Sequence, residues 1–233
     1  SIAGPKSRNF LKKLVVSEDP DKTLSNKEFP WLSYRDIEIG MCPVRALRVA
    51  YTGELGWELH HPIEMQNYLL DILLSSGKEF NLKLVGARAQ NWLRQEKSYK
   101  AFGSDLGRDA GPFESNLSRF VDINKNFLGK DALLKRKTEV SCVTLLIDGP
   151  KGIDPWGREA LYNETEDSIV GRLTSGGYSV HFQKSIGIGY VKSSFSEVGT
   201  KLRIKIDDAF WDAEIVRDSP YDPQNERIID RTN

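Results

Sequence analysis

The segment "RVAYTGELGWELHH" at residues 48–61 holds two glycines, two glutamates, a tyrosine, a tryptophan and two of the chain's three histidines. Gly53 and Gly56 bracket Glu54, which predicts the tip of a β-hairpin with Glu54 in solvent. Glu58 differs, because it stands between two apolar residues inside the outgoing strand. A strand carboxylate either faces water or is buried with partners, since unpaired burial is costly. The ordinary preference of glutamate favours the solvent-facing alternative.

The sequence around this hairpin predicts a mixture of strands and helices. Alternation of apolar residues from 37 to 61 indicates two strands around the turn. Helical spacing of apolar residues predicts a helix at about 5–14, a second that ends near Gly77, and a third over about 86–97. We therefore expect a mixed sheet with helices in this half of the chain.

The pattern changes near Thr138. Beyond it, short β-branched runs recur with glycine, aspartate and asparagine between them, which is typical of a small barrel or sandwich. The Gly176-Gly177 pair predicts a tight turn between two of these strands. The predicted fold class is α+β, with a mixed α+β domain at 1–137 and an all-β, barrel-like domain at 138–233.

Composition narrows the classes of partner and compartment. Lys plus Arg and Asp plus Glu number 33 each, so the chain of 233 residues has no basic excess and we expect no nucleic-acid partner. No apolar run reaches the ~20 residues of a membrane span, so we expect no membrane association. Cys42 and Cys142 lack metal-site spacing, and a bridge between them is the less favoured alternative. Scarce cysteine favours the cytoplasm or the mitochondrial matrix.

The sequence lacks the motifs of several common cofactor, nucleotide and metal sites. The sequence has no GxGxxG between a strand and a helix, no GxxxxGK[ST] and no HExxH. His60 and His61 are adjacent in a predicted strand, so their side chains point to opposite faces and cannot chelate one metal ion together. We expect no metal site.

A second polar cluster, "LRQEKSYK" at 93–100, lies at the end of a predicted helix. Arg94 and Ser98 share a helix face by their spacing. The cluster is either a functional group of side chains or a solvated helix end with ion pairs along the helix. The usual behaviour of charge runs favours the solvated end.

Five segments in order resemble one family. They are "VRALRVAYTGELGWELHHP", "GARAQNWLRQEKSYKAFGSDL", "PFESNLSRFVDINKNFLGKDAL", "GRLTSGGYSVHFQKSIGIGYV" and "YDPQNERI". Together they resemble the glycine cleavage T-protein (aminomethyltransferase) superfamily over about residues 1–231. Within it, "GELGWELH" and "FLGKDAL" are most similar to the C-terminal folate-binding region of dimethylglycine and sarcosine dehydrogenases.

The resemblance implies a tetrahydrofolate site that captures a one-carbon unit as 5,10-methylene-tetrahydrofolate. Glu58 matches the pterin-binding glutamate of the family, and a carboxylate can accept paired N–H bonds from an aminopyrimidine edge. Tyr51 lies near the same site in such sequences, and Arg88 and Arg94 are expected to line or support the pocket. The resemblance identifies no catalytic residue here. FAD is expected only on a separate N-terminal domain, a possible partner of this chain.

Departures from the family qualify these expectations. The arginine that the T-protein uses for folate falls at Gln90, with Arg88 two residues earlier, and Ser98 replaces a usual glycine. The early segment with an assisting aspartate and any flavin-binding half are missing from this sequence. We therefore expect a fragment or split subunit with weak or no catalysis alone. The alternatives are a tetrahydrofolate-dependent aminomethyl or methyl transferase and a non-catalytic binding module.

Overall fold

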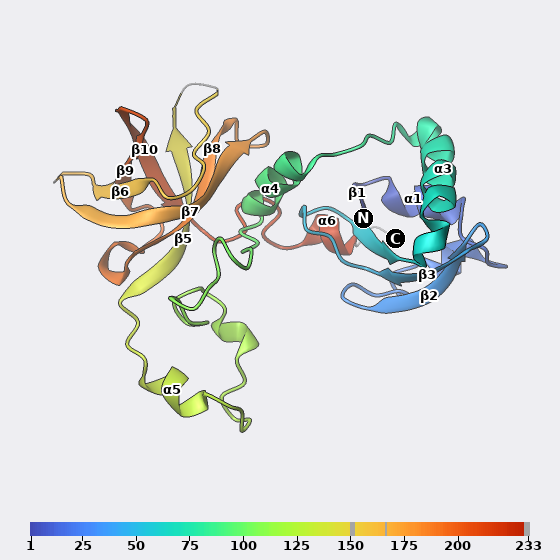
Figure 1. The fold of residues 1–233 in the computed structure, drawn as a ribbon, viewed down its shortest axis with the longest axis horizontal. Coiled ribbons are helices and arrows are strands. Elements are labelled where there is room, and N and C mark those ends of the chain that lie inside the picture. Colours follow the sequence, from blue (N-terminus) through green and yellow to red (C-terminus); the bar gives the residue numbers. More distant parts are fainter. Residues whose placement is uncertain (150–151, 166, 231–233) are drawn as a thin grey trace. The chain divides into compact units, whose positions relative to one another are not determined.

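The computed structural model describes residues 1–149, 152–165 and 167–230, which form two compact units (Figure 1). The first, the sheet unit, comprises residues 1–90 and the chain from Asp222 onward, and the second, the barrel unit, comprises Asn91–Tyr221. These units do not coincide with the domains predicted at 1–137 and 138–233, and that division stays a prediction. The segment after Asn91 groups with the barrel because its buried side chains bond to barrel strands, as described below.

The sheet unit is built on a four-stranded antiparallel sheet in the order β1-β4-β3-β2. Its strands are β1 (Ile2–Ala3), β2 (Tyr34–Ile39), β3 (Cys42–Leu47) and β4 (Gly56–His60). Its helices are α1 (Ser7–Lys12), α2 (Pro20–Thr23), η1 (Ile63–Met65), α3 (Gln66–Gly77), η2 (Lys78–Phe80) and α6 (Glu226–Ile229). The helices expected at about 5–14 and ending near Gly77 are confirmed as α1 and α3.

One face of this sheet carries the core. Phe10 and Leu11 of α1 and Leu69 of α3 pack with alternate residues of β3, among them Val44 and Ala46. This is the period-two pattern of a sheet with one buried face. The residues between them, such as Arg45, are exposed, so the opposite face of β2, β3 and β4 lies open.

The central hairpin is confirmed, but its connection differs from the prediction. Leu47 of β3 pairs with Glu58 of β4, so the two strands flank residues 48–55. Leu55 is only 1% exposed, and Glu54 lies 3.3 Å from the Arg227 guanidinium with its side chain 21% exposed. The prediction of a solvated tip is therefore wrong. The connection packs within the unit, and its Leu55 carbonyl oxygen accepts a hydrogen bond from the Gly4 N–H.

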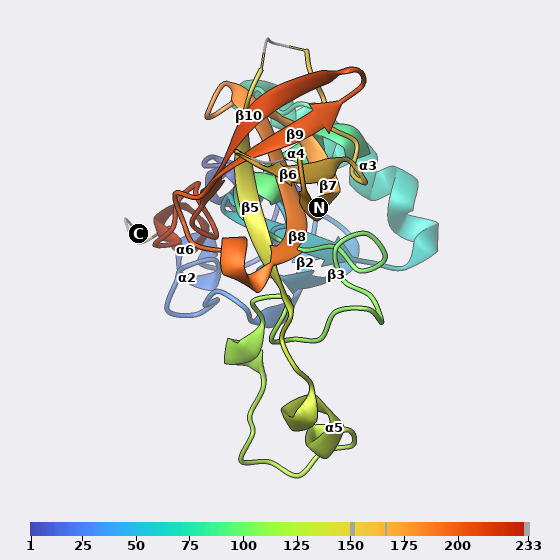
Figure 2. The ribbon, with the colours of Figure 1, turned by 90° about the vertical axis from the view of Figure 1, so that its left-hand side faces the viewer.

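The barrel unit contains a closed six-stranded barrel in the order β10-β5-β8-β7-β6-β9 (Figure 2). Its strands are β5 (Val140–Asp148), β6 (Ala160–Asn163), β7 (Ile169–Ser179), β8 (Lys184–Lys192), β9 (Lys201–Ile206) and β10 (Ala209–Val216). The short helices are η3 (Ser118–Phe120), α5 (Lys130–Lys135) and η4 (Ser193–Phe195), and α4 (Ala87–Glu96) crosses from one unit to the other. The predicted barrel and the α+β fold class are confirmed, and so is the helix over about 86–97.

Gly176 and Gly177 lie inside β7 and form no turn. A Cβ added at Gly176 would lie 2.4 Å from the Pro155 carbonyl oxygen, and one at Gly177 would lie 2.2 Å from Cδ1 of Trp92. The turn prediction is therefore wrong. Glycine serves here because other segments approach the strand too closely for a side chain.

Both cysteines are free and buried, which overturns the alternative of a bridge between Cys42 and Cys142. Burial raises the pKa of the Cys142 thiol to about 12. In the described part of the chain, no helix has the length and apolar character needed to cross a bilayer.

Candidate functional site

Glu58 lies on the open face of the sheet unit. It sits in β4 opposite Leu47, and its side chain is 41% exposed. A cavity of about 1030 Å³ lies in the same unit, lined by residues of β2 and β3 and by His60 and His61 at the end of β4, and Glu58 is not among its lining residues. The solvent-facing alternative for Glu58 therefore holds in part, since more than half of the side chain is covered.

The Glu58 carboxylate has unused hydrogen-bonding capacity. His60 Nε2 lies 3.6 Å from Glu58 Oε2, within ion-pair range but beyond hydrogen-bonding distance. Across residues 1–149, 152–165 and 167–230, no donor bonds to this carboxylate. Two carboxylate oxygens offer about four lone-pair sites. The arrangement can accept two parallel N–H bonds from a ligand.

Two further predicted residues share the sheet unit with Glu58. Tyr51 is half-buried in the connection between β3 and β4, and Arg88 is exposed in the first turn of α4. Each has a polar or ring contact of its own within the chain. Their predicted roles at the ligand remain predictions.

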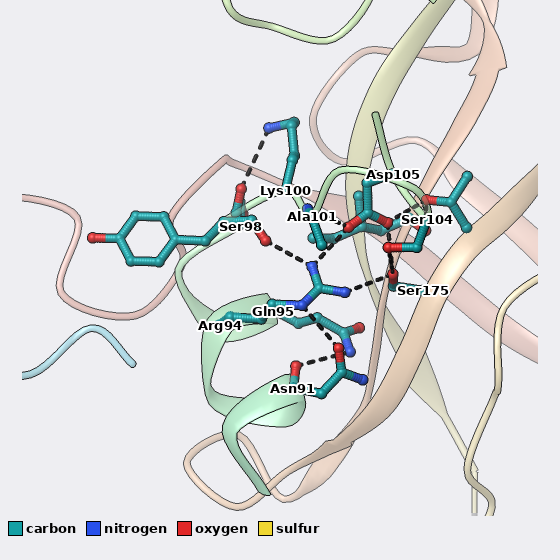
Figure 3. A network of polar contacts seen from close by, with 12 residues as sticks. Asn91, Arg94, Gln95, Ser98, Lys100, Ala101, Ser104, Asp105 and Ser175 are labelled. Atoms are coloured by element: carbon teal, nitrogen blue, oxygen red, sulfur yellow. Dashed lines mark hydrogen bonds and ion pairs between the residues drawn. The ribbon is translucent and has the colours of Figure 1, made fainter. Parts of the chain in front are cut away.

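Arg94 is placed differently, in a buried network of the barrel unit (Figure 3). One of its terminal nitrogens lies 2.7 Å from both Asp105 Oδ2 and the Tyr99 carbonyl oxygen, and the other donates to Ser175 Oγ at 2.7 Å. Its Nε donates to Asn91 Oδ1 at 2.8 Å. A guanidinium with these bonds is engaged within the protein, so the geometry favours a supporting role for Arg94.

The end of α4 is buried rather than solvated. Five consecutive residues, Arg94, Gln95, Glu96, Lys97 and Ser98, are each at most 6% exposed. Glu96 accepts a bond from Ser179 of β7, and Ser98 bonds Thr144 of β5 at 2.7 Å. The solvated helix end favoured by charge alone is therefore wrong, because barrel strands supply partners that make the burial of these charges affordable.

A second cavity is present that no sequence motif predicted. It has a volume of about 900 Å³ and lies inside the barrel unit, between the loop at 103–110 and strands β6, β7 and β8. Within the described residues, no group of three or more His, Cys, Asp or Glu side chains could hold a metal ion.

The fold defines a class of protein, and comparison with known proteins identifies the family. A sheet unit with helices on one face, joined to a closed six-stranded barrel, defines an α+β protein of two compact parts. Residues 1–125 match the GCVT N-terminal domain, and residues 141–222 match the glycine cleavage T-protein C-terminal barrel domain. The chain belongs to the glycine cleavage T-protein family, which confirms the resemblance inferred from the sequence.

Individual relatives fall into two groups. The chain is 38% identical to mitochondrial dimethylglycine dehydrogenase of Mus musculus over 224 residues, which are 93% of this chain and 25% of that protein. It is 32% identical to the aminomethyltransferase of Caldanaerobacter subterraneus over 210 residues, which are 88% of this chain and 54% of that protein. The chain thus spans between a quarter and about half of the length of these relatives.

A solved structure has the same fold. The crystal structure of glycine cleavage system aminomethyltransferase T from Bartonella henselae superposes with a TM-score of 0.78 at 22% sequence identity. The match covers 94% of this chain and 58% of that one. At this identity the likeness concerns the fold alone.

Proposed function

We propose that the chain is a tetrahydrofolate-binding module and that Glu58 holds the pterin. The observation that carries the proposal is the Glu58 carboxylate itself, which is partly covered on an open sheet face and has no hydrogen-bond donor among the described residues. Such a group fits the paired N–H donors of an aminopyrimidine, because charge-assisted bidentate bonds are stronger than neutral ones. Membership of the T-protein family supports the same ligand.

Titration calorimetry of the chain with tetrahydrofolate tests this site. We expect Glu58→Gln, which keeps the shape but removes the charge, to weaken binding by about 10- to 100-fold, since hydrogen bonds to charged groups contribute about 1.5–3 kcal/mol. Glu64→Gln is the matched control, because Glu64 is an exposed glutamate of η1 in the same unit and does not line the cavity. Absence of binding by the parent chain, or equal loss in both variants, would contradict the assignment.

The proposed chemistry is capture of a one-carbon unit as 5,10-methylene-tetrahydrofolate, as part of a dimethylglycine or sarcosine dehydrogenase-like flavoprotein. Formaldehyde adds to two nitrogens of tetrahydrofolate and its oxygen leaves as water, so the step needs no oxidant. The identity of 38% to the mouse dehydrogenase, against 32% to the aminomethyltransferase, favours this role over the transferase alternative. In this proposal FAD, if the protein uses it, is held outside the present chain.

Product formation separates the alternatives. With formaldehyde and tetrahydrofolate supplied, we expect the chain to form methylene-tetrahydrofolate faster than the uncatalysed condensation, and Glu58→Gln to lower that rate. Binding without any acceleration would favour the non-catalytic module. Acceleration only with an aminomethylated donor would favour the transferase.

The proposed compartment is the cytoplasm or the mitochondrial matrix. The dehydrogenase relative in Mus musculus is named as mitochondrial, which supports the second alternative. The proposed small-molecule partner is the folate, and a flavin domain is the proposed protein partner.

A further inference from the structure

The cavity of the barrel unit has the size and walls of a ligand site. Its volume of about 900 Å³ falls within the range of about 300–1,000 Å³ that small-molecule pockets occupy. The loop at 103–110 forms one wall, and segment 156–158 together with β6, β7 and β8 forms the other. All of these segments belong to the barrel unit.

Three cationic side chains line this cavity. They are Arg158, Arg172 and Lys192, and all three are exposed. Among the residues that the structure describes, none of the three side chains has an ion pair or hydrogen bond. Like charges gathered at one place repel one another, so a bound anion would relieve this repulsion.

The nearby carboxylates are largely engaged elsewhere. Asp105 accepts bonds from Arg94 and Thr174, at 2.7 and 2.6 Å, and is itself buried. The two oxygens of Glu159 accept the backbone N–H groups of Trp156 and Gly157, at 2.7 and 2.9 Å. Asp109 is the other acidic residue of the lining. Three cations therefore line the cavity together with one carboxylate, that of Asp109, that takes no part in these hydrogen bonds.

The backbone beside the cations is held in an uncommon conformation. Arg158 has a φ of +88° and Gly157 a φ of +99°. A Cβ at Gly157 would lie 2.6 Å from the Thr174 carbonyl oxygen, while the Arg158 N–H donates to Leu173 at 2.9 Å. A non-glycine residue at positive φ costs about 1–3 kcal/mol, and such strain is concentrated at functional sites.

Aromatic side chains complete the lining. Trp156 is 81% exposed, which leaves much of its indole open to a ligand. Tyr190 is half-buried, its hydroxyl donates to the Asp105 carbonyl oxygen at 2.8 Å, and burial raises its pKa to about 12. The phenol therefore stays neutral near pH 7 and adds no negative charge to the cavity.

We propose that this cavity binds a phosphorylated ligand with a flat aromatic ring, of the size of a mononucleotide. Arg158, Arg172 and Lys192 contact the phosphate, and Trp156 stacks on the ring. Arginine matches phosphate oxygens bidentately, and base–indole stacking contributes about 1–3 kcal/mol. A phosphate of charge near −2 compensates most of the charge of the three cations. A ligand with a single carboxylate group would leave most of that charge uncompensated.

Calorimetry of the full chain with AMP, adenosine and inorganic phosphate tests the proposal. We expect AMP to bind at least 10-fold more tightly than either part alone. Arg172→Gln and Arg158→Gly are expected to weaken AMP binding at least 10-fold, and glycine at 158 keeps the positive φ without strain. Arg203→Gln is the matched control, because Arg203 is a barrel arginine that pairs with Asp167 and lies outside the lining.

Circular dichroism tests whether each variant is folded. Lys192→Gln takes the place of an arginine variant that fails this test. No AMP binding by the folded parent overturns the proposal. So does equal affinity for phosphate alone, unchanged affinity in the lining variants, or an equal loss in Arg203→Gln. Unchanged AMP affinity in Glu58→Gln is expected, which separates this site from the proposed folate site.

Discussion

Glu58 and Arg94 show how partners decide where a charged side chain lies. Arg94 is 3% exposed and meets Asp105, a carboxylate that is also buried. Glu58 has only His60 nearby, with 3.6 Å between His60 Nε2 and Glu58 Oε2, and its side chain stays 41% exposed. The difference follows from the cost of burying charge, which hydrogen bonds and an opposite charge must offset. A satisfied group such as Arg94 supports structure, whereas an unsatisfied one such as Glu58 can bind a ligand.

Substitution of Arg94 is expected to destabilise the chain strongly. Arg94→Met leaves the Asp105 carboxylate buried without its cation, and breaking a buried pair typically costs about 3–5 kcal/mol. Arg203→Met is the control, since its partner Asp167 has a side chain that is 84% exposed, and surface pairs contribute about 0–1 kcal/mol. Urea unfolding followed by circular dichroism measures both, and equal losses of stability would contradict the supporting role of Arg94.

At the scale of elements, the packing of a strand explains what its residues alone do not. The apolar alternation of β3 and β4 predicts their pairing because every second residue joins the core. β7 contains Gly176 and Gly177, which suggest a turn when read alone. The strand continues through them because both glycines pair with β8, and α4 and the Pro155 segment lie where their side chains would be. A glycine pair is thus ambiguous until its neighbours in space are known.

Gly177→Ala is expected to destabilise the contact between β7 and α4. The new Cβ would lie 2.2 Å from Trp92 Cδ1, and overpacking of this kind costs about 1–3 kcal/mol. Gly86→Ala is the matched control, because a Cβ at Gly86 meets nothing within 4 Å. Thermal unfolding compares the two variants. A Gly177 variant as stable as the Gly86 variant would show that Trp92 moves aside freely.

At the scale of the molecule, the sheet unit is discontinuous in sequence. After the barrel, the chain returns, and Asp230 lies 3.1 Å from the buried Arg8 guanidinium. Arg48 donates to the Ile229 carbonyl oxygen at 2.7 Å, and burial lowers its pKa to about 10. Two buried arginines therefore fasten the last described residues to the first unit.

We expect calorimetry to resolve two unfolding transitions, because each compact unit has its own hydrophobic core. Arg48→Met, which removes a bond to the returning segment, should lower the melting temperature of one transition by several degrees. Arg94→Met should lower that of the other. A single transition that both variants shift would contradict the independence of the units. Tetrahydrofolate should raise the melting temperature only of the transition whose melting temperature Arg48→Met lowers.

Local pattern determined much of this protein by itself. Apolar periodicity specified α1, α3, α4, the β3–β4 hairpin and the all-β character after Thr138, because each depends on neighbours within a few residues. The ordered motifs indicated the family and selected Glu58. The tertiary structure decided which charges are buried, since Arg94 and Asp105 have no helical spacing and meet through a loop. It also decided that Arg158, Arg172 and Lys192 line one cavity, because the pairing of β6, β7 and β8 places their segments side by side.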